Sequence, residues 1–122
     1  MTPASSSLHT KLYAALAGLV ALIAALHMAT TFTLTKSTPA GKVWFFGAGL
    51  AMALQAALNF LNRTHGRQVL ALAWTTRVTN VALLAFGAVA GVVTRASTAE
   101  YVALVGSLAG LVVLSCWNRA LR

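Results

Sequence analysis

Residues 69–93 read VLALAWTTRVTNVALLAFGAVAGVV, an apolar run that is interrupted near its start by one arginine, Arg77. A helix needs about 20 apolar residues to cross the ~30 Å hydrocarbon core of a bilayer, and this run is long enough. Charge is costly in hydrocarbon, so an ionisable group at this depth indicates a functional site by default. The chain has only 1 acidic residue, Glu100, and we expect it at the opposite membrane face. Arg77 must therefore meet phosphates, amides, carbonyls or an anion from outside the chain.

Three further apolar runs, at residues 12–29, 43–61 and 101–117, have a similar length. The chain of 122 residues is 59% hydrophobic and 8% charged, whereas soluble domains carry about 25% charged residues. Short connections make neighbouring helices antiparallel. The sequence therefore predicts an all-α membrane protein in which residues 1–122 form a single domain, an up-down bundle of four transmembrane helices with short loops.

Two of the expected helix starts carry capping signals. Thr38 followed by Pro39 is typical of an N-cap and a first-turn proline before the second run. Ser97 and Glu100 have the spacing of a capping box before the fourth run. This pattern gives Glu100 a structural role, because its carboxylate is expected to bond back to a free backbone N–H.

The basic residues predict partners and orientation. The net charge is +8, but the basic side chains are scattered at the ends of the runs, which argues against nucleic acid and favours the lipid bilayer and its anionic headgroups. One membrane face carries Lys11, Arg63, Arg67, Arg119 and Arg122. The other face carries Lys36, Lys42 and Arg95. The positive-inside rule then predicts cytoplasmic termini in a bacterial inner membrane, with Tyr13, Trp74 and Trp117 as an aromatic belt on the cytoplasmic side.

Small residues recur at helical spacing in the apolar runs. Helices in lipid associate through close packing of such residues and through polar contacts. The expected packing glycines are Gly47, Gly87, Gly91, Gly106 and Gly110. These residues either pack the four helices together or leave one face for another chain. The literal GxxxG of Gly106 and Gly110 is the strongest candidate for such a free face.

Polar residues inside the second and third runs are expected to form a cluster. Gln55 and Asn59 are four residues apart and share one helix face, as do Arg77 and Asn80, three residues apart. Both pairs fall in the cytoplasmic half of antiparallel neighbours, so we expect the four side chains to meet. Three interpretations are open: hydrogen bonding between helices, a site for an anion or anionic lipid, or a contact with an acidic residue or cofactor of a partner subunit.

Recognisable catalytic patterns are missing from the sequence. It contains no paired carboxylates, no Ser-His-Asp set, no metal-spaced His/Cys cluster and no glycine-rich phosphate loop. We therefore predict a protein that is not an enzyme and has no resident cofactor or metal. His27, near the outer end of the first run, is expected to bond a nearby threonine hydroxyl, with ligation of a haem or pigment as the alternative.

These features predict a small non-enzymatic integral membrane protein that acts by assembly, as an accessory subunit of a larger membrane complex or as a homo-oligomer. The first alternative is a small transporter or channel for an anionic solute, with Arg77 as the binding charge. The second alternative is a pigment- or haem-binding membrane subunit that uses His27.

Overall fold

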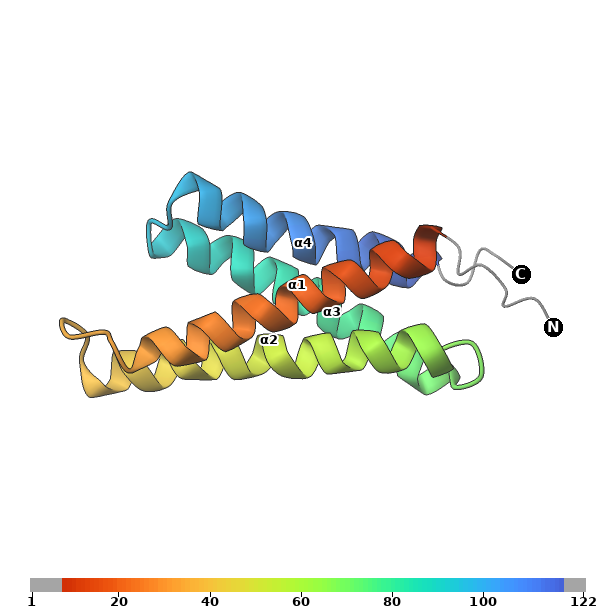
Figure 1. Cartoon of the computed structure of the whole chain (residues 1–122), viewed down its shortest axis with the longest axis horizontal. Coiled ribbons are helices and arrows are strands. Elements are labelled where there is room, and N and C mark those ends of the chain that lie inside the picture. Colours follow the sequence, from red (N-terminus) through yellow and green to blue (C-terminus); the bar gives the residue numbers. More distant parts are fainter. Residues whose placement is uncertain (1–7, 118–122) are drawn as a thin grey trace.

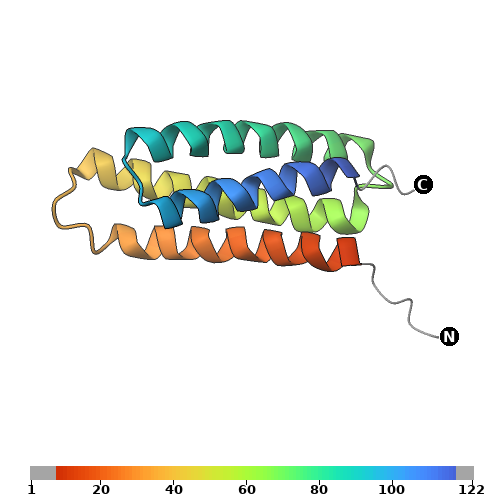
Figure 2. The ribbon, with the colours of Figure 1, turned by 90° about the horizontal axis from the view of Figure 1, so that it is seen from above.

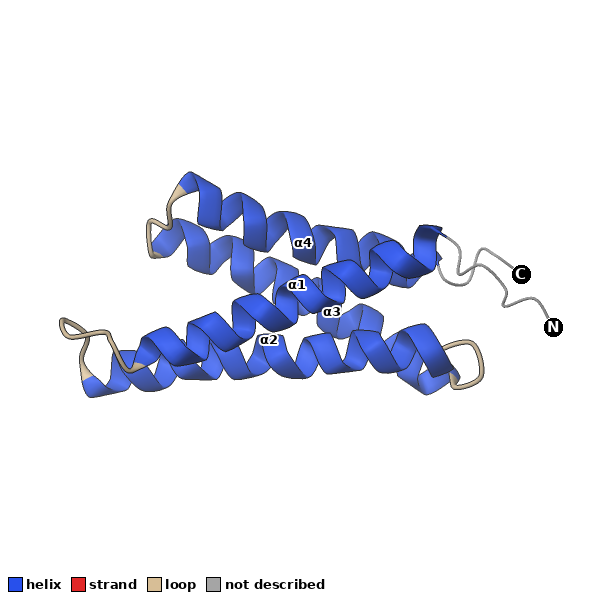
Figure 3. Ribbon diagram, viewed as in Figure 1, coloured by secondary structure: helices blue, strands red, loops and turns tan. Residues whose placement is uncertain are grey.

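The computed structural model describes residues 8–117, and this part of the chain forms four α-helices and no strand (Figures 1 and 3). The helices are α1 (Leu8–Thr31), α2 (Pro39–His65), α3 (Leu70–Val93) and α4 (Thr98–Trp117). At a rise of ~1.5 Å per residue each is long enough to cross a bilayer core. All four are also apolar enough to do so. The prediction of an all-helical chain with four membrane-spanning candidates is confirmed.

The helices match the apolar runs but extend past several of their ends. α1 is already helical at Leu8, the first described residue, and α2 continues to His65, because helical hydrogen bonding does not stop where the side chains become polar. The predicted caps are confirmed. Thr38 Oγ1 accepts a hydrogen bond from Gly41 N at 3.1 Å. Ser97 N donates to Glu100 Oε2 at 3.0 Å, and Glu100 N donates to Ser97 Oγ at 3.3 Å.

The four helices lie side by side along the long axis of the molecule (Figures 1 and 2). α1 packs chiefly against α2, and α3 chiefly against α4. α1 is tilted, so that its beginning lies near the end of α4 while its last turns lie near the beginning of α2 (Figure 1). The bundle thus consists of two helix pairs that are closest together at one end.

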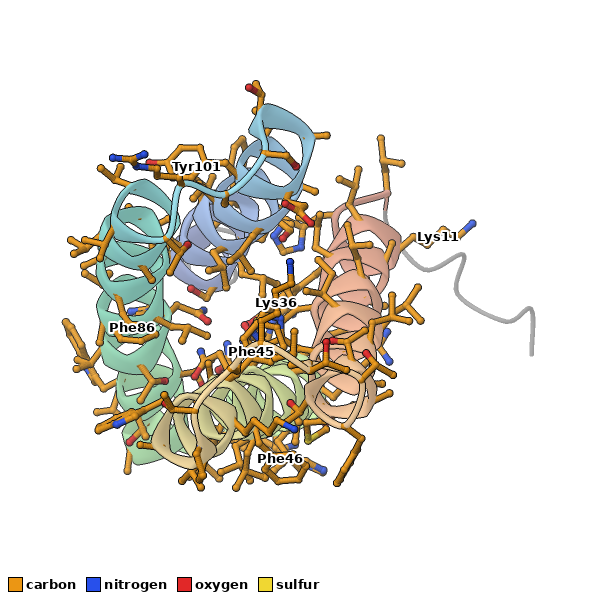
Figure 4. All side chains as sticks on the ribbon, turned by 90° about the vertical axis from the view of Figure 1, so that its left-hand side faces the viewer. Lys11, Lys36, Phe45, Phe46, Phe86 and Tyr101 are labelled. Atoms are coloured by element: carbon orange, nitrogen blue, oxygen red, sulfur yellow. The ribbon has the colours of Figure 1, made fainter. Side chains whose placement is uncertain are left out.

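The apolar core is small, and large apolar side chains cover the outside. The fully buried cluster consists of Tyr13, Ala17, Val20, Ala24, Met52, Ala56, Leu108 and Leu111. Leu22, Leu54 and Phe86 are all more than half exposed. Adjacent residues divide the same way in Figure 4, where Phe45 lies toward the inside of the bundle and Phe46 on its outer side. An apolar exterior of this kind suits a lipid environment, in which outward apolar side chains are solvated by lipid tails.

Three of the five expected packing glycines lie against a neighbouring side chain. A Cβ on Gly87 would lie 3.3 Å from Leu108 Cδ1, and a Cβ on Gly110 would lie 2.6 Å from Leu16 Cδ1. Gly91 lies against the ring of Tyr101. Gly47 and Gly106, in contrast, have no atom within 4 Å of an added Cβ.

Gly47 and Gly106 are open for different physical reasons. Gly47 precedes Gly49, which packs on α1, by two residues, and two residues turn a helix by about 200°, so Gly47 faces outward. Gly106 lies one turn before Gly110 and has no atom within 4 Å of an added Cβ. Figure 1 shows that α1 and α4 diverge toward the beginning of α4. The GxxxG of α4 is therefore divided between an inner contact and an open face.

The closest approach of α1 and α2 generates a prediction about Gly49. A Cβ at this position would lie 2.7 Å from Met28 Cγ and 3.2 Å from the Ala24 carbonyl oxygen, so Gly49→Ala should lower the free energy of unfolding in detergent by about 1–3 kcal/mol. The matched control is Gly47→Ala, which should be neutral or stabilising because helix propensity rises. Equal stabilities for the two variants would contradict the packing.

Candidate functional site

Two buried asparagines form the centre of the molecule. Asn59 on α2 and Asn80 on α3 are both 0% exposed. Their side-chain amides bond reciprocally, from Asn59 Nδ2 to Asn80 Oδ1 at 2.8 Å and from Asn80 Nδ2 to Asn59 Oδ1 at 3.0 Å. This amide pair joins α2 to α3, and through them it joins the two helix pairs.

The pair extends to α1 through a buried tyrosine. Tyr13 Oη donates to Asn59 Oδ1 at 2.9 Å and accepts from Asn62 Nδ2 at 2.8 Å. Asn59 Nδ2 also donates to the Gln55 carbonyl oxygen at 2.8 Å. An asparagine side chain has two donor hydrogens and an oxygen with two lone pairs, so Asn59 uses its full bonding capacity.

The pair extends to α4 through Asn80. Its Nδ2 donates to Ser115 Oγ at 3.2 Å and to the Leu111 carbonyl oxygen at 3.3 Å. Gln55 Nε2 donates to Asn80 Oδ1 and, at 3.5 Å, to the Thr76 carbonyl oxygen. Every helix of the bundle thus contributes to one network, which we call the polar core: Tyr13, Gln55, Asn59, Asn62, Thr76, Asn80 and Ser115.

The structure brings together three of the four residues that the sequence places in a cluster: Gln55, Asn59 and Asn80. The sequence analysis missed the contributions of α1 and α4. Tyr13 was expected in an interfacial belt, which is wrong because its side chain is only 1% exposed. Tyr13 and the buried Ala17 are four residues apart on one face of α1, and this spacing is the signal for its inward position.

Arg77 does not join Gln55, Asn59 and Asn80 as the sequence predicted. Its side chain lies beside the polar core and bonds α4. Its Nε donates to the Ser115 carbonyl oxygen at 3.2 Å, and its Nη2 contacts the Cys116 carbonyl oxygen at 3.5 Å. The guanidinium also lies 5.5 Å from the centre of the Trp74 ring. The side chain reaches α4 because α4 is the main neighbour of α3.

The position of Arg77 has a simple electrostatic basis. Ser115 and Cys116 belong to the last turn of α4 that the structure describes, toward the carboxyl end of the helix, where the helix dipole is negative. A guanidinium provides several donors to such carbonyls, and a cation is stabilised there. Arg77 therefore bonds carbonyl groups of α4 from a neighbouring helix, and these bonds stabilise a half-buried charge that has no carboxylate beside it.

His27 lies in the other half of the bundle, on α1. Its ring stacks on Phe45 of α2 with 3.6 Å between ring centres and 17° between planes. The expected threonine contact involves its backbone and not its ring, because Thr30 and Thr31 donate to the His27 carbonyl oxygen at 3.1 Å and 3.0 Å. Between residues 8 and 117, no three His, Cys, Asp or Glu side chains are grouped to hold a metal ion.

Comparisons of the chain with protein families, with curated proteins and with solved structures find no match. The geometry itself defines the class of protein. It is a bundle of four helices that are long and apolar enough to cross a membrane, with large apolar side chains outside and a hydrogen-bonded polar core inside. A polar core of this kind specifies which helix faces meet, because any other pairing leaves amides unbonded in an apolar medium.

The polar core predicts a large effect for Asn80→Leu. This change removes the interhelical bonds of Asn80 and leaves the amide groups of Gln55 and Asn59 without their partner, so the free energy of unfolding should fall by about 2 kcal/mol. Thr79→Val is the control, because Thr79 Oγ1 bonds only within α3, to the carbonyl oxygens of Thr75 and Thr76. Similar melting curves for both variants in detergent would refute the role of the amide pair.

The bonds of Arg77 to α4 carbonyls predict local fraying in Arg77→Leu. Without the guanidinium, the carbonyl groups of Ser115 and Cys116 lose a bonding partner, and the last turn of α4 should exchange its amide hydrogens about tenfold faster, equivalent to ~1.4 kcal/mol. In Arg77→Lys, the exchange rates of these amides should lie between those of Arg77→Leu and those of the natural protein. Hydrogen exchange measured by mass spectrometry provides the rates, and unchanged exchange at the end of α4 in Arg77→Leu would contradict the assignment.

Proposed function

We propose that the protein is a non-enzymatic integral membrane protein that acts by assembly and that α4 is the helix that meets another chain. The observation that carries this proposal is the outward face of α4. The residues on this face, which we call the α4 stripe, are Val102, Gly106, Ala109, Val113 and Cys116. They follow spacings of four and three, so they lie along one side of the helix.

The α4 stripe differs from the outward faces of the other helices. Those faces carry long apolar side chains such as Leu26 on α1, Leu54 on α2 and Phe86 on α3, each more than half exposed. Such side chains suit contact with lipid tails, whereas a face of Gly, Ala, Val and Cys allows the backbone of a second helix to approach closely. An added Cβ on Gly106 would meet no atom within 4 Å, as is also true of Gly18 and Gly47. Gly106 differs in that no long apolar side chain stands beside it on the α4 stripe, so the partner of this face is expected outside the chain.

In this proposal the chain crosses the membrane as an up-down bundle with both termini on the cytoplasmic side of a bacterial inner membrane. The support is the unequal distribution of basic residues. By sequence, five basic residues are expected at the end of the bundle where α1 begins and α2 ends, against three at the other end, and basic residues concentrate on the cytoplasmic side. The five are Lys11, Arg63, Arg67, Arg119 and Arg122, of which the last two lie outside the described residues, and the three are Lys36, Lys42 and Arg95. The polar core lies nearer this end than the outer one.

The same geometry weighs against the two alternatives. A transporter or channel for an anion needs donors that are available to the solute. Asn59 and Asn80 use their bonding capacity on other residues of the chain, and Arg77 donates to α4 carbonyls. For the pigment or haem alternative, the stacking of His27 on Phe45 explains the position of this ring without a ligand. Assembly is therefore the function that the contacts favour.

Assembly through the α4 stripe predicts that Gly106→Leu breaks the complex. A leucine there should hold a neighbouring helix away, so the association constant should fall at least about tenfold, equivalent to ~1.4 kcal/mol. Native mass spectrometry of protein extracted in mild detergent from its own membrane measures the associated fraction. It also shows whether the partner is a second copy or another subunit.

Ala85→Leu is the matched control, because Ala85 lies on the exposed face of α3 and the change also adds a large side chain outside the bundle. It should leave assembly intact. A natural chain that is monomeric under these conditions would contradict the proposal, and so would equal assembly of the Gly106→Leu and Ala85→Leu variants.

A further inference from the structure

A pocket of about 270 Å³ opens at the end of the bundle where α1 begins and α2 ends. It lies between the first turns of α1 and the last turns of α2, and the ring centre of His9 is 6.4 Å from that of Trp117 in the last described turn of α4. Its lining residues are His9, Thr10, Tyr13, Arg63, Thr64 and Arg67. The lining is polar and basic, unlike the apolar exterior of the four helices.

Two nitrogen atoms of this lining are buried without a hydrogen-bond partner. They are His9 Nε2 and Arg63 Nε. The second is an N–H of a guanidinium, which is always a donor, and an imidazole nitrogen that carries its proton is a donor as well. A buried polar group without a partner is destabilising, and more so when it is charged. The residues of the pocket wall therefore contain bonding capacity that the chain leaves unused.

The remaining polar groups of the wall are occupied by the fold. Thr64 Oγ1 donates to the carbonyl oxygens of Phe60 and Leu61 on its own helix. Tyr13 Oη, at the base of the pocket, bonds Asn59 and Asn62 of the polar core. The groups left to receive a ligand are thus basic, and they are Arg63, Arg67 and His9.

No acidic side chain lies beside the pocket in the part of the chain that the structure describes. The only acidic residue of the chain is Glu100, which begins α4 at the opposite end of the bundle and bonds Ser97. Two guanidinium groups and an imidazole around one cavity are the chemistry of oxyanion recognition, because guanidinium donors match the oxygens of a phosphate group. Basic side chains beside a membrane surface also attract anionic lipids.

We propose that this pocket binds a phosphate group, with Arg63 Nε and His9 Nε2 as its buried donors and Arg67 as the cation at its mouth. The phosphate belongs either to the headgroup of an anionic phospholipid or to a soluble phosphate anion, since both present the same oxygens. Because Tyr13 connects the base of the pocket to the polar core, a bound phosphate also stabilises the contact between α1 and α2. This site is independent of assembly through α4.

The test measures binding to purified, delipidated full-length protein in neutral detergent. One arm follows the melting temperature as inorganic phosphate is added, with chloride at equal ionic strength as the reference. The other arm uses native mass spectrometry with phosphatidylglycerol, and with phosphatidylcholine as the neutral-lipid reference. Protection by phosphate beyond that by chloride identifies a soluble anion, whereas retention of phosphatidylglycerol alone identifies a headgroup site. Either result supports the proposal.

Arg63→Gln should weaken the observed binding at least about tenfold, because it removes a charged donor. Arg95→Gln is the matched control, since it removes the same charge beyond the other end of α3 and should change binding by less than about twofold. Arg67→Gln provides a second variant at the mouth of the pocket, should Arg63→Gln fail to fold by circular dichroism. Absence of binding in both arms overturns the proposal. Equal losses in the Arg95→Gln variant and the pocket variant also overturn it.

Discussion

The reciprocal amide bond between Asn59 and Asn80 is the interaction on which the arrangement of the four helices depends. Apolar helix faces gain little by leaving lipid for one another, so packing and polar contacts must determine which faces meet. Asn59 and Asn80 are completely buried and bond one another in both directions. Their remaining groups bond Tyr13 of α1 and Ser115 of α4. An alternative arrangement would leave several amide groups unbonded in an apolar medium, and this cost selects one packing of the bundle.

Several structural features follow from the position of this network near one end of the molecule. The helix pairs are held together there, and the tilt of α1 carries it away from α4 toward the other end (Figure 1). This divergence leaves Gly106 open while Gly110, one turn later, contacts Leu16. At the same end, Tyr13 connects the network to the wall of the basic pocket. The α4 stripe and the basic pocket are therefore two consequences of one packing arrangement.

The sequence predicted the helices well because length and hydropathy determine them locally. It also placed Gln55, Asn59 and Asn80 together, since four- and three-residue spacings put polar groups on one face of each helix. The contacts of Arg77 could not be predicted from the sequence. Its side chain could reach either α2 or α4, and which of the two it bonds depends on which helix packs closer to α3. The sequence analysis assigned Tyr13 to an interfacial belt, because a tyrosine with a buried bonding partner and one at the membrane surface look alike in sequence. The spacing of residues along a helix does not predict the tilt of α1. The open position of Gly106 could therefore be recognised only in the structure.

The central claim is that Asn59 and Asn80 bond each other inside the natural protein in a bilayer. Solid-state NMR of protein labelled with ¹³C and ¹⁵N at asparagine, in lipid bilayers, tests it most directly. The account predicts through-space cross peaks between the side-chain amide nitrogen of each residue and the side-chain carbonyl carbon of the other, with slow exchange of both amides with water. Absence of these cross peaks, together with rapid exchange of either amide, would contradict the account.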